Sequence, residues 1–249
     1  MAVFFVTGGS RGIGEAVVLA AARSGHDVAF TFRTREAEAA AVAERACSVR
    51  GGGRFRAYGL DVSDPGQVEA VGERVLADFE AVDVVVSNAG LNRNNLVVSM
   101  SDEEWHSVLG VNLTGAFYVA RQFLPTFLAR RKGRFVFVSS LGATGVSGQA
   151  NYSASKAGLL GLSAALAKEY GRKGITANVV VPGFFDTDMT RETMPQLNKD
   201  YWAKYCPMPK GRMGEISELA GVVNFLASEA GGFVNGEIIN VTGGLNWTY

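Results

Sequence analysis

The chain has 249 residues, of which 47% are hydrophobic, and its 24 lysine and arginine residues balance 24 aspartate and glutamate residues. This composition indicates a soluble globular protein, and a formal net charge of zero offers no long-range field to attract nucleic acid or an anionic membrane. The cysteines, Cys47 and Cys206, and the histidines, His26 and His106, lack metal-ligand spacing, so neither a metal site nor a disulfide framework is expected.

The amino-terminal sequence, MAVFFVTGGSRG, enters an apolar run without a basic lead or a small-residue cleavage site. No later apolar run reaches the length of a membrane span. We therefore expect a cytoplasmic protein.

Short runs rich in Val, Phe and Ile alternate along the chain with Ala- and Leu-rich segments of helical length. Several of the short runs are apolar at every position, as strands buried on both faces of a parallel sheet must be. The pattern predicts a doubly wound α/β sheet in a single domain, residues 1–249, because no repeat or linker divides the chain. The expected strands are 3–7, 27–33, 54–60, 83–87, 135–139, 177–181 and 237–241, and the expected helices include 14–24, 35–49, 67–79, 102–128 and 152–170.

A glycine-rich loop, TGGSRGIG, joins the first expected strand to the first helix. Such a loop lets backbone amides and the helix amino terminus approach a pyrophosphate without Cβ clashes. Its spacing differs from the general G-x-G-x-x-G fingerprint, so the loop alone is also compatible with a plain turn between strand and helix. The expected cofactor contacts here are Thr7, Gly8, Ser10, Arg11, Gly12, Ile13 and Gly14.

The end of the second strand indicates which dinucleotide binds. A carboxylate at this place would accept the ribose hydroxyls of NAD, but the chain has Arg33. Arg33 and Arg11 could both donate charge-assisted hydrogen bonds to a 2′-phosphate, which favours NADPH, although either could instead be a solvated loop charge. Further contacts are expected at the ends of the next two strands: Asp61 and Val62 at the adenine, and Asn88, Ala89 and Gly90 along the cofactor.

Tyr152 and Lys156 stand four residues apart at the start of a helical segment and so share one helix face. A phenol titrates at about pH 10. A neighbouring ammonium and an oxidised nicotinamide would favour its ionised form and make it a proton donor and acceptor near neutral pH. The same spacing also occurs on many ordinary helix surfaces, so the pair needs support from other residues.

Two further residues provide that support. Ser139, thirteen residues before Tyr152, ends the fifth strand, where its hydroxyl could donate to a substrate carbonyl oxygen. Ser140 is the competing candidate, and the spacing favours Ser139. Asn112 lies within an expected helix that its side chain does not favour, and it could hold a water beside Lys156 or be satisfied locally.

The whole chain resembles the short-chain dehydrogenase/reductase family. TGGSRGIG at 7–14, the DV at 61, the NAG at 88, Asn112, Ser139, the YSASK at 152 and the PG at 182 stand in the family's order. The resemblance implies a Rossmann-type fold with Asn112, Ser139, Tyr152 and Lys156 as a catalytic tetrad. It also implies that Lys156 holds the nicotinamide ribose and that Pro182, Gly183 and Thr187 lie along the nicotinamide.

Within that family, the chain is most similar to 3-oxoacyl-[acyl-carrier-protein] reductases and to related polyketide and acetoacetyl-CoA reductases. The residues that carry this similarity are 148–158, 182–190 and 211–228. It implies NADPH-dependent reduction of a 3-oxoacyl thioester, linked to acyl carrier protein or CoA, with Tyr152 as proton donor. An NADP(H) dehydrogenase of a sugar, polyol or cyclic alcohol is the alternative. A non-catalytic nucleotide-binding scaffold is a remote one, because the tetrad is complete.

Two other segments suggest how substrate and partners bind. Residues 184–213 are rich in Phe, Met, Tyr and Trp and could form a lid over an acyl chain, or could fill core and subunit contacts. Basic residues could dock an acidic carrier protein or CoA phosphates, or could be solvated charges that complement helix dipoles. The resemblance also implies a homotetramer, with the helices around Asn112 and Tyr152 at an interface. The basic residues are Arg130, Arg131, Lys132, Arg134, Arg172 and Lys173.

Overall fold

The computed structural model describes residues 1–187 and 196–245. Seven parallel strands form one sheet in the order β3-β2-β1-β4-β5-β6-β7, which confirms the predicted doubly wound α/β fold. The strands are β1 (Val3–Val6), β2 (Asp27–Phe32), β3 (Phe55–Gly59), β4 (Val84–Ser87), β5 (Gly133–Val138), β6 (Ile175–Pro182) and β7 (Ile238–Val241).

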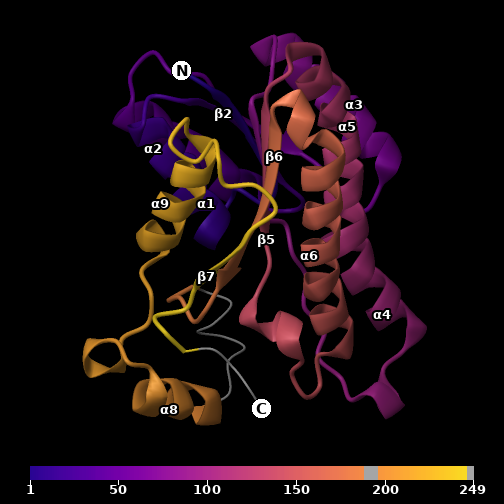
Figure 1. Cartoon of the computed structure of the whole chain (residues 1–249), viewed down its shortest axis with the longest axis vertical. Coiled ribbons are helices and arrows are strands. Elements are labelled where there is room, and N and C mark those ends of the chain that lie inside the picture. Colours follow the sequence, from indigo (N-terminus) through magenta and orange to yellow (C-terminus); the bar gives the residue numbers. More distant parts are fainter. Residues whose placement is uncertain (188–195, 246–249) are drawn as a thin grey trace.

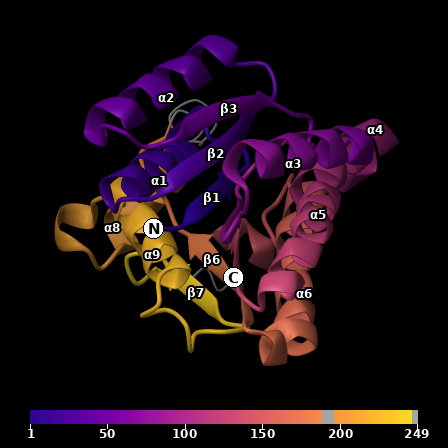
Figure 2. The same ribbon diagram turned by 90° about the horizontal axis from the view of Figure 1, so that it is seen from above.

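Helices cover both faces of the sheet (Figures 1 and 2). One face packs against α1 (Gly12–Arg23), α2 (Glu36–Val49) and α9 (Ile216–Ala227). The other packs against α3 (Pro65–Phe79), α5 (Gly115–Arg130) and α6 (Ala150–Tyr170). Within the described residues, the other α-helices are α4 (Asp102–Leu109) and α8 (Gln196–Tyr205), and α8 lies beyond the end of the sheet at which β6 finishes (Figure 1).

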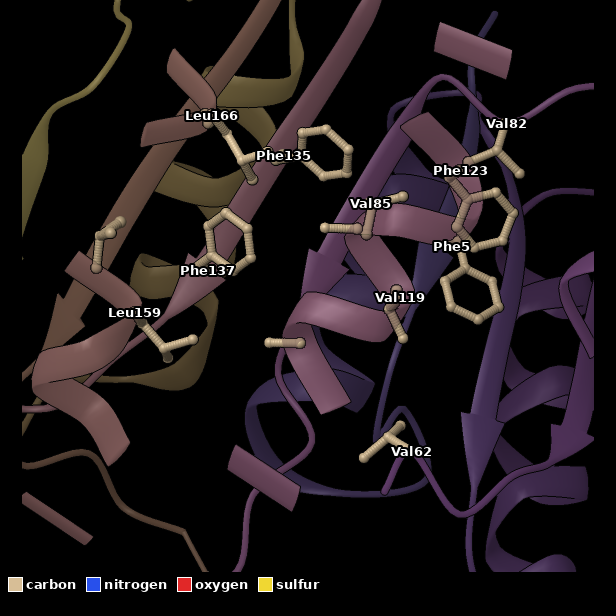
Figure 3. Close-up of a cluster of buried hydrophobic side chains, with 14 of the residues drawn as sticks. Phe5, Val62, Val82, Val85, Val119, Phe123, Phe135, Phe137, Leu159 and Leu166 are labelled. Atoms are coloured by element: carbon tan, nitrogen blue, oxygen red, sulfur yellow. The ribbon is translucent and has the colours of Figure 1, made fainter. Parts of the chain in front are cut away.

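Alternation of side chains along the strands divides the core into two layers. Phe4 faces α1, α2 and α9, whereas Phe5 faces the other layer and lies against Phe123 of α5, with ring centroids 4.7 Å apart (Figure 3). Full burial of each such ring stabilises the fold by about 2 kcal/mol. Because both faces are covered, only the ends of the strands remain open to a ligand.

The expected helix over residues 102–128 is interrupted. α4 and α5 are separated by a π-helical turn, Gly110–Thr114, and Asn112 lies within it. Such turns are rare and often occur at functional sites. The turn brings the Asn112 amide against the backbone of Leu91, which offers hydrogen bonds that a regular helix surface does not.

Within the described residues, no helix combines the length and apolar character needed to cross a membrane.

Candidate active site

A cavity of about 350 Å³ follows the carboxyl ends of six neighbouring strands, from β3 to β6. Six strand ends side by side extend over about 24 Å, a length suited to an extended dinucleotide. Most residues that the sequence placed at the cofactor or the reaction line this cavity. They are Gly8, Ser10, Arg11, Gly12, Ile13, Arg33, Asp61, Val62, Asn88, Ala89, Gly90, Ser139, Tyr152, Lys156, Pro182 and Thr187.

Four of the named residues stand behind the lining instead. Thr7 accepts hydrogen bonds from the amides of Asn88 and Ala89, each at 3.0 Å. A Cβ on Gly14 would collide with the Gly8 carbonyl, and one on Gly183 would lie 2.9 Å from the Thr242 Cα. These three residues and Asn112 shape the cavity wall.

The sequence reasoning missed eight lining residues. Most are neighbours of predicted ones, and the signal that could have found them is their place at a strand end. Arg35 is the most informative, because it adds a third cation beside Arg33 and Arg11, although it also pairs with Glu38 at 3.1 Å. The eight are Thr31, Phe32, Thr34, Arg35, Leu60, Leu91, Val111 and Val138.

The glycine-rich loop has the conformation that an anion site requires. Gly8 and Gly12 have φ values of 67° and 55°, which favour glycine. α1 then begins at Gly12 without a side-chain cap, so its first amides remain available to a phosphate. The Asn88 amide donates to the carbonyls of Thr7 and Gly8, each at 3.0 Å, and so ties the loop after β4 to the loop after β1.

Tyr152 and Lys156 lie one turn apart on α6 and line the cavity beside the end of β5. Lys156 is 4% exposed, and its ammonium donates to the Val138 carbonyl at 2.8 Å. Burial lowers the pKa of Lys156 to about 8. The Lys156 Nζ lies 5.8 Å from the centroid of the Tyr152 ring.

The pKa of Tyr152 differs from the sequence expectation. Burial raises it, and a hydrogen bond with the Ser140 hydroxyl opposes that effect only in part. The expected lowering by the ammonium is not found, because Lys156 points to Val138 rather than to the phenol. The phenol therefore holds its proton at neutral pH.

The two serines after β5 point in different directions. The Ser139 hydroxyl is buried and donates to the main-chain carbonyl of Lys156 at 2.9 Å. The Ser140 hydroxyl bonds with the Tyr152 phenol and accepts from the Gly142 amide at 3.0 Å. Consecutive side chains of an extended chain point to opposite sides, so only one of the two can face the phenol. That residue is Ser140, whereas the spacing favoured Ser139.

The Asn112 side chain, 2% exposed, makes three hydrogen bonds within the protein. Its Oδ1 accepts from the Leu91 amide at 2.7 Å, and its Nδ2 donates to the Leu91 carbonyl and to the Ser155 hydroxyl, each at 3.0 Å. Asn112 therefore joins the pocket wall to α6 through its amide.

The basic residues lie at the opposite end of the sheet, before β5 and β6 begin. Tyr152 and Arg172 are separated by the length of α6, about 30 Å. Arg130 pairs with Asp83, and Lys132 with Glu229, each at 2.8 Å. Docking at these residues could not deliver a substrate to the cavity of the same protomer.

The expected lid segment, 184–213, is described only in part, because 188–195 lie outside the described residues. Trp202 of α8 is buried, meets the edge of the Phe184 ring with centroids 4.9 Å apart, and donates to the Arg212 carbonyl at 3.1 Å. A second cavity, of about 110 Å³, lies between these residues and β7.

Comparison with known proteins places the chain among reductases. A family model described as enoyl-(acyl carrier protein) reductase matches residues 8–246. The chain is 39% identical to the 3-oxoacyl-[acyl-carrier-protein] reductase FabG of Escherichia coli over 98% of its own length and 96% of that protein. It is 38% identical to the proteins of the same name from Haemophilus influenzae, over 98% and 97%, and Staphylococcus aureus, over 96% of each.

Proposed function

The chain belongs to the short-chain dehydrogenase/reductase family, and from this we propose that it uses NADPH to reduce the ketone of a 3-oxoacyl thioester to the 3-hydroxyacyl product. One observation supports the proposal above all others. A partly buried tyrosine and a buried lysine line a dinucleotide-sized cavity, in a chain that matches 3-oxoacyl reductases over nearly its whole length.

The cavity fits NADPH in shape and in charge. The uncapped start of α1 and the loop Gly8–Gly14 would hold the pyrophosphate, and Arg11, Arg33 and Arg35 would hold a 2′-phosphate. Asp61 and Val62 would lie at the adenine. Lys156, Asn88–Gly90 and Pro182–Thr187 would lie near the nicotinamide, which supplies a hydride when it is bound.

The protein's own groups supply the proton. Tyr152 holds a proton at its hydroxyl because burial raises its pKa, and it donates this proton to the substrate oxygen as that oxygen gains negative charge. The Ser140 hydroxyl, beside the phenol, donates a hydrogen bond to the same oxygen. The buried Lys156 ammonium, with its Nζ 5.8 Å from the centroid of the Tyr152 ring, would hold the nicotinamide ribose beside the phenol.

We extend the proposal to assembly. An exposed Phe117 on α5, an exposed Phe233 before the edge strand β7 and an exposed Ile238 within β7 suit contacts between copies of the chain, as in a homotetramer. In a two-fold dimer through α5 and α6, these helices would run antiparallel to their copies. The basic end of one protomer would then lie near the cavity of the other, where Arg131, Arg172 and Lys173 could dock an acidic carrier protein.

We also propose a domain organisation, a location and a lid for this enzyme. The single domain, residues 1–249, would work in the cytoplasm. Residues 184–213, anchored by Trp202, would close over the acyl chain as a lid.

The proposed reaction is tested by NADPH and NADH oxidation with acetoacetyl-CoA and with a 3-oxoacyl carrier protein. NADPH-selective turnover of both is expected. Turnover of free sugars or cyclic alcohols in place of thioesters, or of an enoyl thioester alone, would overturn the thioester-ketone assignment.

Carrier docking is tested by Arg172→Glu combined with Lys173→Glu. The double variant should raise the KM for the carrier-bound substrate and leave that for acetoacetyl-CoA unchanged. Arg130 is avoided, because it pairs with Asp83. An unchanged KM for the carrier-bound substrate would contradict docking at this surface.

A further inference from the structure

Two side-chain amides and one main-chain hydrogen bond hold the segment that leaves the cavity after Gly90. Asn112 bonds with both the amide and the carbonyl of Leu91. The Asn151 side chain donates to the Arg93 carbonyl at 3.0 Å. The main-chain N–H of Asn95 donates to the Gly148 carbonyl at 2.9 Å. Every second residue from 91 to 95 is thus attached to the π turn, to α6 or to the loop before α6.

Asn151 stands at the centre of these attachments and is fully buried. Its Nδ2 also donates to the Glu104 carbonyl of α4 at 3.1 Å, and its Oδ1 accepts from the Tyr152 amide at 2.7 Å. α6 has no side-chain cap, so Asn151 satisfies an amide of its first turn. Two donors and one acceptor are used together, which an aspartate or an alanine cannot reproduce.

Both backbone groups of Tyr152 are tied to the same segment. The Tyr152 amide is held by Asn151, which also holds Arg93. The Tyr152 carbonyl accepts from the Ser155 hydroxyl at 2.7 Å, and that hydroxyl accepts from Asn112, which holds Leu91. Leu91 lines the cavity. The position of the phenol relative to the cavity wall therefore depends on two asparagine amides.

We propose that Asn151 is a positioning residue for the reduction, an inference that rests on the proposed function. Its amide joins the cavity wall, α4 and the first turn of α6 into one unit, which fixes the Tyr152 phenol relative to the substrate oxygen. A shift of about 1 Å at a reacting group can cost about 100-fold in rate. Loss of the amide should consequently appear in kcat rather than in binding.

The test compares Asn151→Ala and Asn151→Asp with Asn178→Ala. Asn178 is 1% exposed, donates to the Val234 carbonyl at 2.8 Å and accepts from the Glu237 amide at 3.0 Å, away from the cavity. All three variants should lower Tm. Only the Asn151 variants should lower kcat, by about 10- to 100-fold at a temperature where every protein is folded, with KM and NADPH affinity changed little.

A kcat for the Asn151 variants close to that of the wild type would overturn the proposal, as would an equal loss in Asn178→Ala. Asn151→Asp keeps the side-chain volume and the acceptor for Tyr152, and so provides the measurement if Asn151→Ala does not fold. If the wild type reduces another ketone and no thioester, the substrate assignment fails, and the same comparison is made with that ketone.

Discussion

The two ends of the sheet differ in how a buried ionisable side chain is partnered. At the amino end, Asp27 is 2% exposed and pairs with Arg50 at 2.9 Å and Arg54 at 2.8 Å. Burial opposes its ionisation, but hydrogen bonds from Arg54 and Arg50 hold the pKa of Asp27 below its usual range. At the carboxyl end, the Lys156 ammonium donates to a neutral carbonyl, and burial lowers its pKa to about 8.

The difference separates charges that hold the fold from charges that do chemistry. A buried carboxylate paired with arginines keeps one protonation state and joins β2 to the segments after it. A buried ammonium facing a carbonyl, beside a phenol whose pKa is raised, has a protonation that a ligand's charge can change. Substitutions at the amino end should therefore act on stability, and substitutions at the carboxyl end on turnover.

The largest effect is expected from Tyr152→Phe, which removes the proton donor and keeps the ring. Turnover of the ketone should fall by about 10⁴-fold, because the Ser140 hydroxyl at the same oxygen is a much weaker acid than the phenol and does not replace it as proton donor. NADPH affinity, measured by fluorescence titration, should stay near that of the wild type. Near-normal turnover would place the proton donor elsewhere.

The amino end provides the opposite case. Asp27→Ala should lower the free energy of unfolding by about 2 kcal/mol, because it removes the charge-assisted hydrogen bonds that the buried carboxylate accepts from two partly exposed arginines. The pKa of Asp27 is lowered in the folded state, so its contribution is present above the unfolded-state pKa and is lost as pH falls through the folded-state pKa. Urea unfolding at neutral and acid pH measures both. If Asp27→Ala instead lowered kcat without lowering the free energy of unfolding, the proposed difference between the two ends of the sheet would be wrong.

Ser140→Ala and Ser139→Ala test which of the two serines at the carboxyl end of β5 donates to the substrate oxygen. Ser140→Ala should lower kcat about 100-fold, because a donor to the substrate oxygen is lost. The hydrogen bond from Ser140 lowers the pKa of Tyr152, so its removal should raise that pKa further. Alcohol oxidation, which needs the phenolate, should then require a higher pH than in the wild type.

Ser139→Ala should leave this pH profile unchanged, because its hydroxyl bonds with the Lys156 carbonyl. The reverse result, with the profile shifted only by Ser139→Ala, would return the catalytic role to Ser139.

The smallest effect is expected at the outer edge of the cavity. Arg33→Ala should reduce the preference for NADPH over NADH by about tenfold, the worth of one charge-assisted hydrogen bond. Arg35→Ala should have less effect, since Arg35 also pairs with Glu38. The ratio of kcat/KM values for the two cofactors measures both, and an unchanged ratio in Arg33→Ala would remove that residue from the 2′-phosphate site.

Much of the molecule could be predicted from short stretches of sequence. Continuous apolar runs such as VFFV and FVFV predicted buried parallel strands, and the glycines after the first of them predicted the anion loop. The candidate site residues follow the ends of the expected strands, and this placement predicted most of the cavity lining, because parallel strands bring their carboxyl ends to one edge of the sheet. These features depend on local backbone preference and on burial, and both can be inferred from the residue types in a short stretch of sequence.

Other features depended on which elements pack together. Spacing favoured Ser139 over Ser140, but the direction of each hydroxyl depends on how the end of β5 meets α6. The sequence proposed the basic residues near Arg130 and Arg172 as a docking site, but only the parallel sheet placed them a helix length from the cavity of their own protomer. By itself the sequence determined the strands, the anion loop and the candidate reacting groups. Only the tertiary structure decided which side chains face one another, since side-chain direction is a property of packed elements.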